Sequence, residues 1–491
     1  LLQTLEDMND KLNRTWSPAS HLHSVADNDQ LREAYNNCIS KLSDYSTEMG
    51  QNEELFNAYE QIAGADSFKF LSTAQQKIIT NSLRDFQLSG IALGTKAKER
   101  YKLIQQQLSK LQTKFEENLL DATHAWRKLI TDKDELEGLP ESCIELAAQT
   151  AKDVGKEGWI FTLEFPSYMP VMQYADNVSL REEIYGAYVT RASEKGPNAG
   201  QFDNSEIMNK ILQYRTEKAK LLGFESYAHY SLATKMAENT NEVLDFLNNL
   251  IERTKKYAEK EYEELTLFAK ETANVPRLQA WDVVYYSEKL RQKKFDISQE
   301  ELRAYFPVNQ VIEGLFAITE KLYGVTINQR EGVQIWHKDV MFYDILNQEG
   351  EISGSFYLDL FARRHKRGGA WMDECIVRKK TSTGIQNPVA YLTCNFSPPL
   401  GDKPALLTHD EVTTLFHEFG HGLHHMMTKI EYSGVSGING VPWDAVELPS
   451  QFMENWCWEK EALDLFARHI DSGEILDNKI FKKMMKARTF Q

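Results

Sequence analysis

Cysteine is scarce in this 491-residue sequence, and long apolar runs are missing. The cysteines are odd in number, scattered and free of the C-x-x-C spacing of metal ribbons and redox motifs. They predict buried free thiols in a reducing compartment, so we expect a cytoplasmic protein. No apolar stretch in the sequence reaches the roughly 18 residues of a membrane-spanning helix, which argues against a membrane protein. The cysteines are Cys38, Cys143, Cys375, Cys394 and Cys457.

Positive charge is also in short supply. Lysine and arginine number 56 against 72 aspartates and glutamates, which gives a net charge of −16. Nucleic-acid-binding proteins need basic patches, so we expect no nucleic-acid partner. Hydrophobic residues make up 42% of the chain, which is ample for a buried core. The length corresponds to roughly three domain-sized units.

Helical periodicity, in contrast, is abundant. Apolar side chains recur every three to four residues along segments with few prolines, which predicts a mainly α protein. We expect helices over 1–14, 28–47, 72–91, 95–122, 204–223 and 239–274. Strand patterns occur at 159–165, in a hairpin within 341–361 that turns at 347–350, and at 375–380 and 388–396. A small antiparallel or mixed sheet should therefore precede the histidine-rich stretch that follows.

That stretch is "TLFHEFGHGLHHMMT", residues 414–428. Thr408 and Glu411 have the spacing of a capping box, so a helix should begin just after Thr408. His417 and His421 then lie on one face about 6 Å apart, close enough for both imidazoles to bind one zinc ion. Glu418 projects beside them. This H-E-x-x-H arrangement is typical of zinc hydrolases, with two ligands and a general base.

Two further histidines follow on the same helix. His424 lies two turns from His417, roughly 10 Å along the axis, which is too far to bind the same ion. The longer pattern H-E-x-x-H-x-x-G-x-x-H fails, because His424 occupies its glycine position and Met427 its last histidine position. We interpret His424 and His425 as surface residues or supports for the ligands, with substrate contact as the alternative.

A catalytic zinc ion needs a third protein ligand. Glu447 is the best candidate, because a glycine-rich reversal separates it from the first helix and allows a second helix to return. Asp444 is a candidate cap for that second helix, although Pro449 leaves its start open by several residues. Glu454 would share a face with Glu447, so it is a rival ligand or else a partner of a ligand. Either acid could instead simply serve the helix dipole.

The stretches "HDEVTTLFHEFGHGLHHMMT" and "GVSGINGVPWDAVELPSQFMENWCWE" resemble the thimet oligopeptidase family of zinc metallopeptidases, and within it the bacterial oligopeptidase A branch. Others, such as "GSFYLDLFAR" and "KRGGAWMDEC", extend the resemblance over nearly the whole chain. The resemblance implies one Zn²⁺ per chain, held by His417, His421 and Glu447, with Glu418 as the catalytic glutamate. It also implies a monomeric endopeptidase that hydrolyses short unstructured peptides.

The same resemblance implies two mainly helical halves, 1–98 with 293–491 and 99–292, on either side of a deep substrate channel. The chain starts at Leu1 rather than Met and stops without a helix-ending signal, so we expect both termini to be truncated. By the resemblance, tyrosine and histidine donors to the reaction's oxyanion lie in the missing C-terminal region.

Some alternatives remain open. A dipeptidyl carboxypeptidase of the same superfamily would need a cation for the peptide's C-terminal carboxylate, for which Arg363, Arg364 and Arg367 are candidates. A catalytically incomplete peptide-binding protein is the other possibility. An edge strand within 387–396 could pair with substrate, or could simply pair within the sheet. The basic loop 362–371 is better explained as a solvated turn than as a gate.

Overall fold

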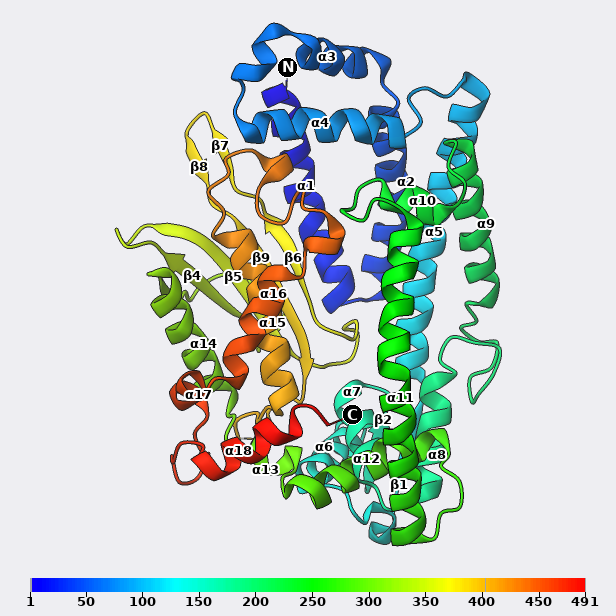
Figure 1. Ribbon diagram of the computed structural model, residues 1–491, viewed down its shortest axis with the longest axis vertical. Coiled ribbons are helices and arrows are strands. Elements are labelled where there is room, and N and C mark those ends of the chain that lie inside the picture. The colour runs from blue at the N-terminus through cyan, green and yellow to red at the C-terminus, as the bar shows by residue number, and fades with distance from the viewer. Residues whose placement is uncertain (1, 402, 491) are drawn as a thin grey trace.

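The computed structural model describes residues 2–401 and 403–490. Within them the chain forms eighteen α-helices and nine strands, which confirms a mainly α protein. The sheet and the helices around it lie on one side of the molecule, and three long helices, α5, α9 and α11, lie on the other (Figure 1). No helix in the described part of the chain is long and apolar enough to cross a membrane.

The first five helices form the N-terminal part. They are α1 (Leu2–Val25), α2 (Asp29–Gly50), α3 (Glu53–Gly64), α4 (Thr73–Leu88) and α5 (Thr95–Ala125). The helix expected over 1–14 continues to residue 25 and contains Pro18. Its second half packs on a strand of the sheet, where the Ser17 hydroxyl donates to the Glu374 carbonyl. Tertiary contacts therefore extend a helix that the local sequence would end earlier.

The middle of the chain is helical apart from one small two-stranded sheet. Its strands are β1 (Arg127–Ile130) and β2 (Trp159–Thr162). Its helices are α6 (Glu141–Asp153), α7 (Phe165–Tyr174), α8 (Val178–Val189), α9 (Ser205–Leu221), α10 (Tyr227–Leu232), α11 (Thr240–Ala273) and α12 (Ala280–Phe295). The strand expected over 159–165 is thus confirmed in its first four residues only. The division into 1–98 with 293–491 and 99–292 stays a prediction.

A five-stranded mixed sheet precedes the histidine-rich helix, as expected. Its spatial order is β3 (Thr326–Gln329), β4 (Met341–Leu346), β5 (Ile352–Phe361), β9 (Val389–Phe396) and β6 (Trp371–Ile376). The β4–β5 hairpin is confirmed, and its turn is fixed by the Asn347 side chain, which accepts the backbone N–H groups of Glu349 and Glu351. A separate hairpin joins β7 (Lys379–Thr381) to β8 (Gly384–Gln386).

Of the two alternatives for 387–396, ordinary pairing within the sheet is confirmed and the edge strand is wrong. That range contains β9, which lies inside the sheet, parallel to β5 and antiparallel to β6. Six of its eight side chains are buried, as is typical of a central strand covered on both faces. The edge on this side is β6, whose side chains are mostly half-buried.

The remaining helices are α13 (Gln299–Arg303), α14 (Val308–Tyr323), α15 (His409–Met426), α16 (Leu448–Glu454), α17 (Lys460–Phe466) and α18 (Asn478–Ala487). Of these, α14 and α15 pack on the sheet and the others pack mainly on neighbouring helices. The largest buried core lies among α14, α15, α17 and the inner strands, and includes Phe356, Phe416 and Phe419. This core packs α15 against β9. The position of the helix face that carries the histidines is therefore fixed relative to the sheet.

Candidate metal and catalytic site

Helix α15 begins as its sequence predicts. The Glu411 backbone N–H donates to the Thr408 hydroxyl oxygen over 3.1 Å, and the Thr408 backbone N–H donates to the Glu411 carboxylate over 2.8 Å. Helix α16 then crosses α15 at Gly420. A Cβ at Gly420 would lie 2.6 Å from the Cα of Ser450, so only glycine permits this close approach. The crossing brings the acidic residues of the second segment over the histidines.

Three candidate ligands meet at this crossing. Glu447 Oε2 lies 3.2 Å from Nε2 of His417 and 3.2 Å from Nε2 of His421. The ligand atoms of the three residues all lie within 4.8 Å of one another. Two imidazole nitrogens and one carboxylate oxygen are a donor set that suits a catalytic zinc ion and leaves a coordination position open. The residues present therefore fit the expected metal.

Glu454 lies behind this group. Its Oε1 is 2.7 Å from Nδ1 of His417, the ring nitrogen on the side away from Glu447. A carboxylate in this position fixes the orientation and tautomer of a metal-binding imidazole. Of the two roles left open by the sequence, the geometry favours a partner of a ligand over a rival ligand.

Glu418 is the candidate general base, and it is buried. Burial raises the pKa of its carboxyl group to about 7, and the charge of Glu447 adds to this rise. The proximity of His417 and a hydrogen bond from the backbone N–H of Met372 act in the opposite direction on the same pKa. Met372 belongs to the edge strand β6, so the outer edge of the sheet lies directly beside Glu418.

The two remaining histidines of α15 do not join the group of ligands. His425 is fully buried, and its Nε2 lies 3.0 Å from the carbonyl oxygen of Ile376 in β6. Its interpretation as a surface residue or ligand support is wrong, because the end of α15 packs against the edge strand. His424 is half-buried, and burial lowers its pKa.

The loop 362–371 is anchored, so its interpretation as a solvated turn is wrong. The Lys366 ammonium group is buried and donates to the Asp359 carboxylate over 2.8 Å and to the Cys394 carbonyl over 2.6 Å. Arg363 donates to the same carboxylate over 2.6 and 2.7 Å, and Arg367 lies over the ring of Trp371.

The cysteines are free thiols throughout the described residues, as expected. Cys143, Cys394 and Cys457 are buried, whereas Cys38 is exposed and Cys375 is half-buried, so the prediction of burial fails for two of the five.

Comparison with known proteins decides the family. Residues 171–491 match the family described as Peptidase family M3, and residues 1–98 match the description "Neurolysin/Thimet oligopeptidase, N-terminal domain". The chain belongs to peptidase family M3. This M3 peptidase is 55% identical to Oligopeptidase A of Haemophilus influenzae, over 99% of this chain and 72% of that protein. It is 53% identical to Oligopeptidase A of Escherichia coli, over 100% of this chain and 72% of that protein.

More distant relatives share the fold. Dipeptidyl carboxypeptidase of Escherichia coli is 29% identical over 99% of the M3 peptidase and 71% of its own length. The crystal structure of a Bacillus anthracis protein assigned as an oligoendopeptidase F superposes with a TM-score of 0.54 at 15% identity, covering 99% of this chain and 68% of that one. That likeness shows the fold alone. The family expected from the sequence is confirmed.

Proposed function

We propose that this M3 peptidase is a zinc-dependent oligopeptidase, an endopeptidase that hydrolyses short unstructured peptides. The observation that carries the proposal is the convergence of His417, His421 and Glu447 within 4.8 Å beside the buried Glu418. The high identity to two proteins named Oligopeptidase A supports the substrate class.

In this proposal the three convergent residues hold one Zn²⁺, and Glu454 orients the His417 ring through its Nδ1. The ion, when bound, supplies a Lewis acid that polarises a carbonyl and acidifies water. Glu418 accepts a proton from the attacking water and passes it to the leaving amine. The hydrogen bond from Met372 fixes the direction of that carboxylate. Burial keeps its affinity for the proton high enough for the transfer, because the pKa lies near neutrality.

We further propose that the peptide lies along β6. No strand lies beyond β6 in the described sheet, and an extended peptide can add to such an edge by main-chain hydrogen bonds. The contact between Glu418 and the Met372 backbone supports this, because it joins the edge strand to the proposed general base. A substrate bound there would present its backbone carbonyl groups to the residues that carry out hydrolysis.

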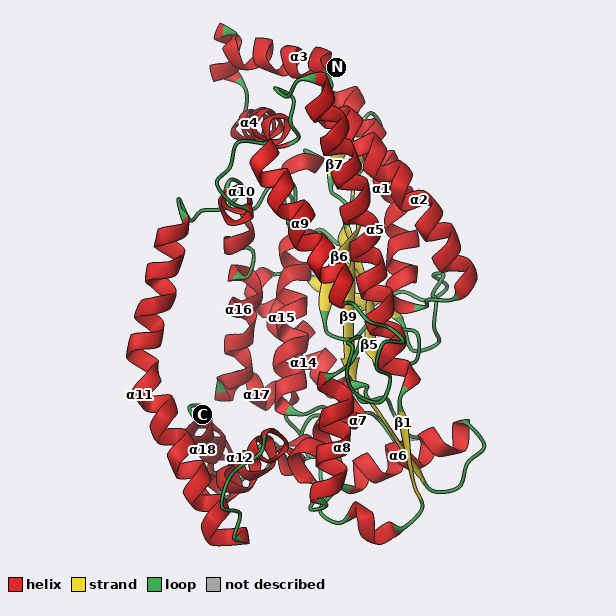
Figure 2. Cartoon of the chain, turned by 90° about the vertical axis from the view of Figure 1, so that its right-hand side faces the viewer, coloured by secondary structure: helices red, strands yellow, loops and turns green. Residues whose placement is uncertain are grey.

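The two-part architecture belongs to the same proposal. Helix α11 runs alongside α15 and α16 and stands apart from them in both views (Figures 1 and 2). We propose that 99–292 forms the wall opposite 1–98 with 293–491, and that the protein is monomeric and cytoplasmic. Size-exclusion chromatography with light scattering tests the oligomeric state directly.

The dipeptidyl carboxypeptidase alternative has weaker support. The relative of that name is 29% identical, well below the 53–55% of the two oligopeptidases. Arg363, one candidate for binding a terminal carboxylate, is already paired with Asp359. Among the contacts of the described residues, none points to a site for a C-terminal carboxylate.

The test measures zinc content together with cleavage of a short internally quenched peptide, offered with a free and with an amidated C-terminus. We expect about one zinc per chain, cleavage of both peptides, and loss of activity in Glu418→Gln with zinc retained. Cleavage of the free-carboxylate peptide alone would favour the dipeptidyl carboxypeptidase. A zinc-loaded wild-type chain that cleaves neither peptide would contradict the proposal.

A further inference from the structure

Asp444 makes a contact that the catalytic site does not explain. It lies in a short 3-10 turn, Trp443–Ala445, three residues before Glu447. The sequence suggested a helix cap, but α16 begins at Leu448 and Asp444 caps nothing there. Its carboxylate instead accepts the backbone N–H of Met236 at 2.9 Å from each oxygen, and that of Ala237 at 3.0 Å. Both amides belong to the link between α10 and α11.

The helix that follows this link has little else to hold its first two-thirds. The three buried side chains of α11 lie near its C-terminal end, at Leu265, Phe268 and Ala269. Every residue from 244 to 260 is exposed, including apolar side chains such as Leu247 and Ile251. Since burial does not fix this part of the helix, its position depends on the contacts at its N-terminal end.

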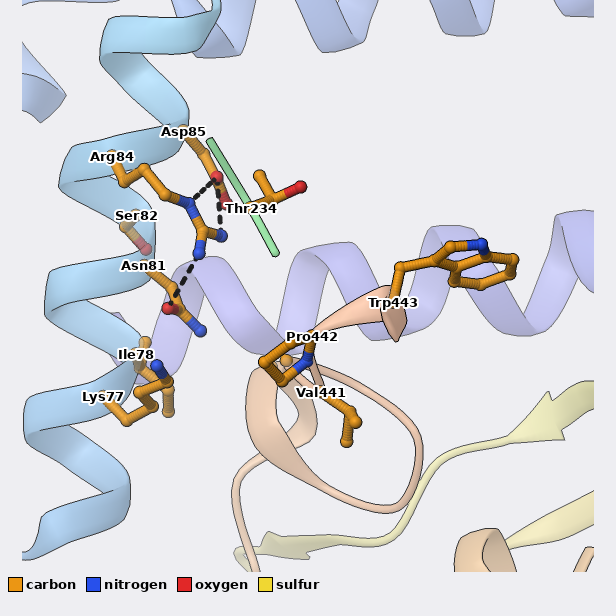
Figure 3. A pocket seen from close by; sticks show the side chains of 12 residues that line it. Lys77, Ile78, Asn81, Ser82, Arg84, Asp85, Thr234, Val441, Pro442 and Trp443 are labelled. Atoms are coloured by element: carbon orange, nitrogen blue, oxygen red, sulfur yellow. Dashed lines mark hydrogen bonds and ion pairs between the residues drawn. The ribbon is translucent and has the colours of Figure 1, made fainter. Parts of the chain in front are cut away.

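The residues that flank this contact, Thr234 on one side and Pro442 and Trp443 on the other, line an open space rather than a packed core. A cavity of about 430 Å³ separates α4 from Thr234 on one side and from Pro442 and Trp443 on the other (Figure 3). Arg84 in its wall is not a partner of Asp444, since it donates to Asp85 over 2.9 Å and is directed along α4. The Lys235 charge acts favourably on the Asp444 carboxylate beside the two amides. Side-chain packing therefore does not fix the link between α10 and α11. The hydrogen bonds to the Asp444 carboxylate connect this link to the segment that carries Glu447.

We propose that Asp444 is a positioning residue that fastens the N-terminal end of α11 to the segment carrying Glu447. This inference rests on the proposed peptidase function for its effect on substrate. The carboxylate holds two amides of the opposite wall, while Glu447, one turn further on, faces the histidines. Helix α11 is thereby kept at a fixed distance from the proposed catalytic residues. A short peptide can then contact α11 and the catalytic residues at the same time. Without the contact, α11 can move outwards and peptide binding weakens.

The experiment compares Asp444→Ala and Asp444→Asn with the wild-type chain, and uses Asp471→Ala as a control for loss of an exposed carboxylate. Hydrogen–deuterium exchange of 234–245 and zinc affinity are measured for all four proteins, together with KM and kcat on one quenched peptide. Asp444→Ala should shift exchange of 234–245 to faster rates and raise KM by about three- to tenfold, the range for an exposed hydrogen bond to a charge. Its zinc affinity should stay within twofold of wild type, about the precision of such titrations.

Asp444→Asn keeps an acceptor oxygen and should recover at least part of the protection, whereas Asp471→Ala should change nothing. Unchanged exchange in Asp444→Ala would overturn the inference, and so would an asparagine variant no better than alanine. Zinc affinity that falls as far as in Glu447→Ala would also overturn it, because Asp444 would then act on the ligand itself. If wild type cleaves no peptide, the proposed function fails, and the exchange rates still decide whether Asp444 holds α11.

Discussion

Replacing Glu454 tests whether the carboxylate behind His417 supports the metal site or belongs to it. Its Oε1 lies 2.7 Å from His417 Nδ1. Loss of such a partner typically reduces metal affinity by about 10- to 100-fold. The Glu454 side chain is 34% exposed, so water screens part of its charge, and we expect the effect of Glu454→Ala to fall near the tenfold end. Tenfold corresponds to about 1.4 kcal/mol of binding free energy.

Competition with a zinc chelator of known affinity measures this difference. Glu454→Gln separates charge from hydrogen bonding, because its amide oxygen still accepts from Nδ1–H, and it should lose less affinity than Glu454→Ala. Gln451→Ala is the matched control, since Gln451 lies on the same helix and is exposed. Its zinc affinity should equal that of wild type.

Two outcomes would refute the reasoning. A zinc affinity within twofold of wild type for Glu454→Ala would show that the 2.7 Å contact has no influence on the metal. If Glu454→Ala lost stoichiometric zinc as completely as Glu447→Ala, Glu454 would be a zinc ligand rather than a partner of His417. Circular dichroism of each variant checks that the fold is retained before the affinities are compared.

Further outcomes follow from the same structure. Glu418→Gln should retain zinc and lose about 10²- to 10⁴-fold in kcat, measured at matched zinc content, because an amide cannot accept the proton. Gly420→Ala should push α16 away and weaken zinc binding in the chelator assay, since its Cβ would lie 2.6 Å from backbone atoms of 449–450. Burial lowers the pKa of His21 from 6.5 to about 3. As the pH falls from 6.5 towards 3, the His21 imidazole therefore binds a proton in the unfolded chain but not in the folded protein. The free energy of unfolding should therefore fall by up to about 1.4 kcal/mol per pH unit from this group, and urea unfolding of His21→Phe should lack that contribution. Lys366→Met should lower the free energy of unfolding by about 3–5 kcal/mol in the same assay, or somewhat less because Arg363 still pairs with Asp359.

The sequence allowed the helix-borne part of the site to be predicted because that part is local. The spacing of His417 and His421 sets their separation on any helix, and the capping box at Thr408 sets where the helix begins. The hairpin turn near Asn347 was equally accessible, since its side chain bonds amides only two and four residues away. None of these features depends on how distant segments pack.

The remaining features depend on such packing. Whether Glu447 or Glu454 lies close to both His417 and His421 is decided by where α16 crosses α15, and that close crossing is permitted by the missing Cβ of Gly420. The edge strand was misplaced because β9 inserts between β5 and β6, against the order of the chain. A basic loop usually predicts solvated side chains, whereas the partners of Lys366 are a buried carboxylate and backbone carbonyl groups of β5 and β9.

The segment from 444 to 454 contacts α15 at one end and the link before α11 at the other. It packs on α15 through the close approach at Gly420. Within the segment, the Ser450 hydroxyl donates to the Glu447 carbonyl oxygen over 2.8 Å and lies 3.0 Å from its Oε2. Next to α11, the exposed Asp444 carboxylate accepts the backbone N–H groups of Met236 and Ala237. A buried backbone contact cannot yield without distorting the ligands, whereas an exposed carboxylate exchanges readily with water. The Asp444 hydrogen bonds should therefore break before the Gly420 contact does, so Asp444→Ala should loosen the start of α11 without displacing Glu447.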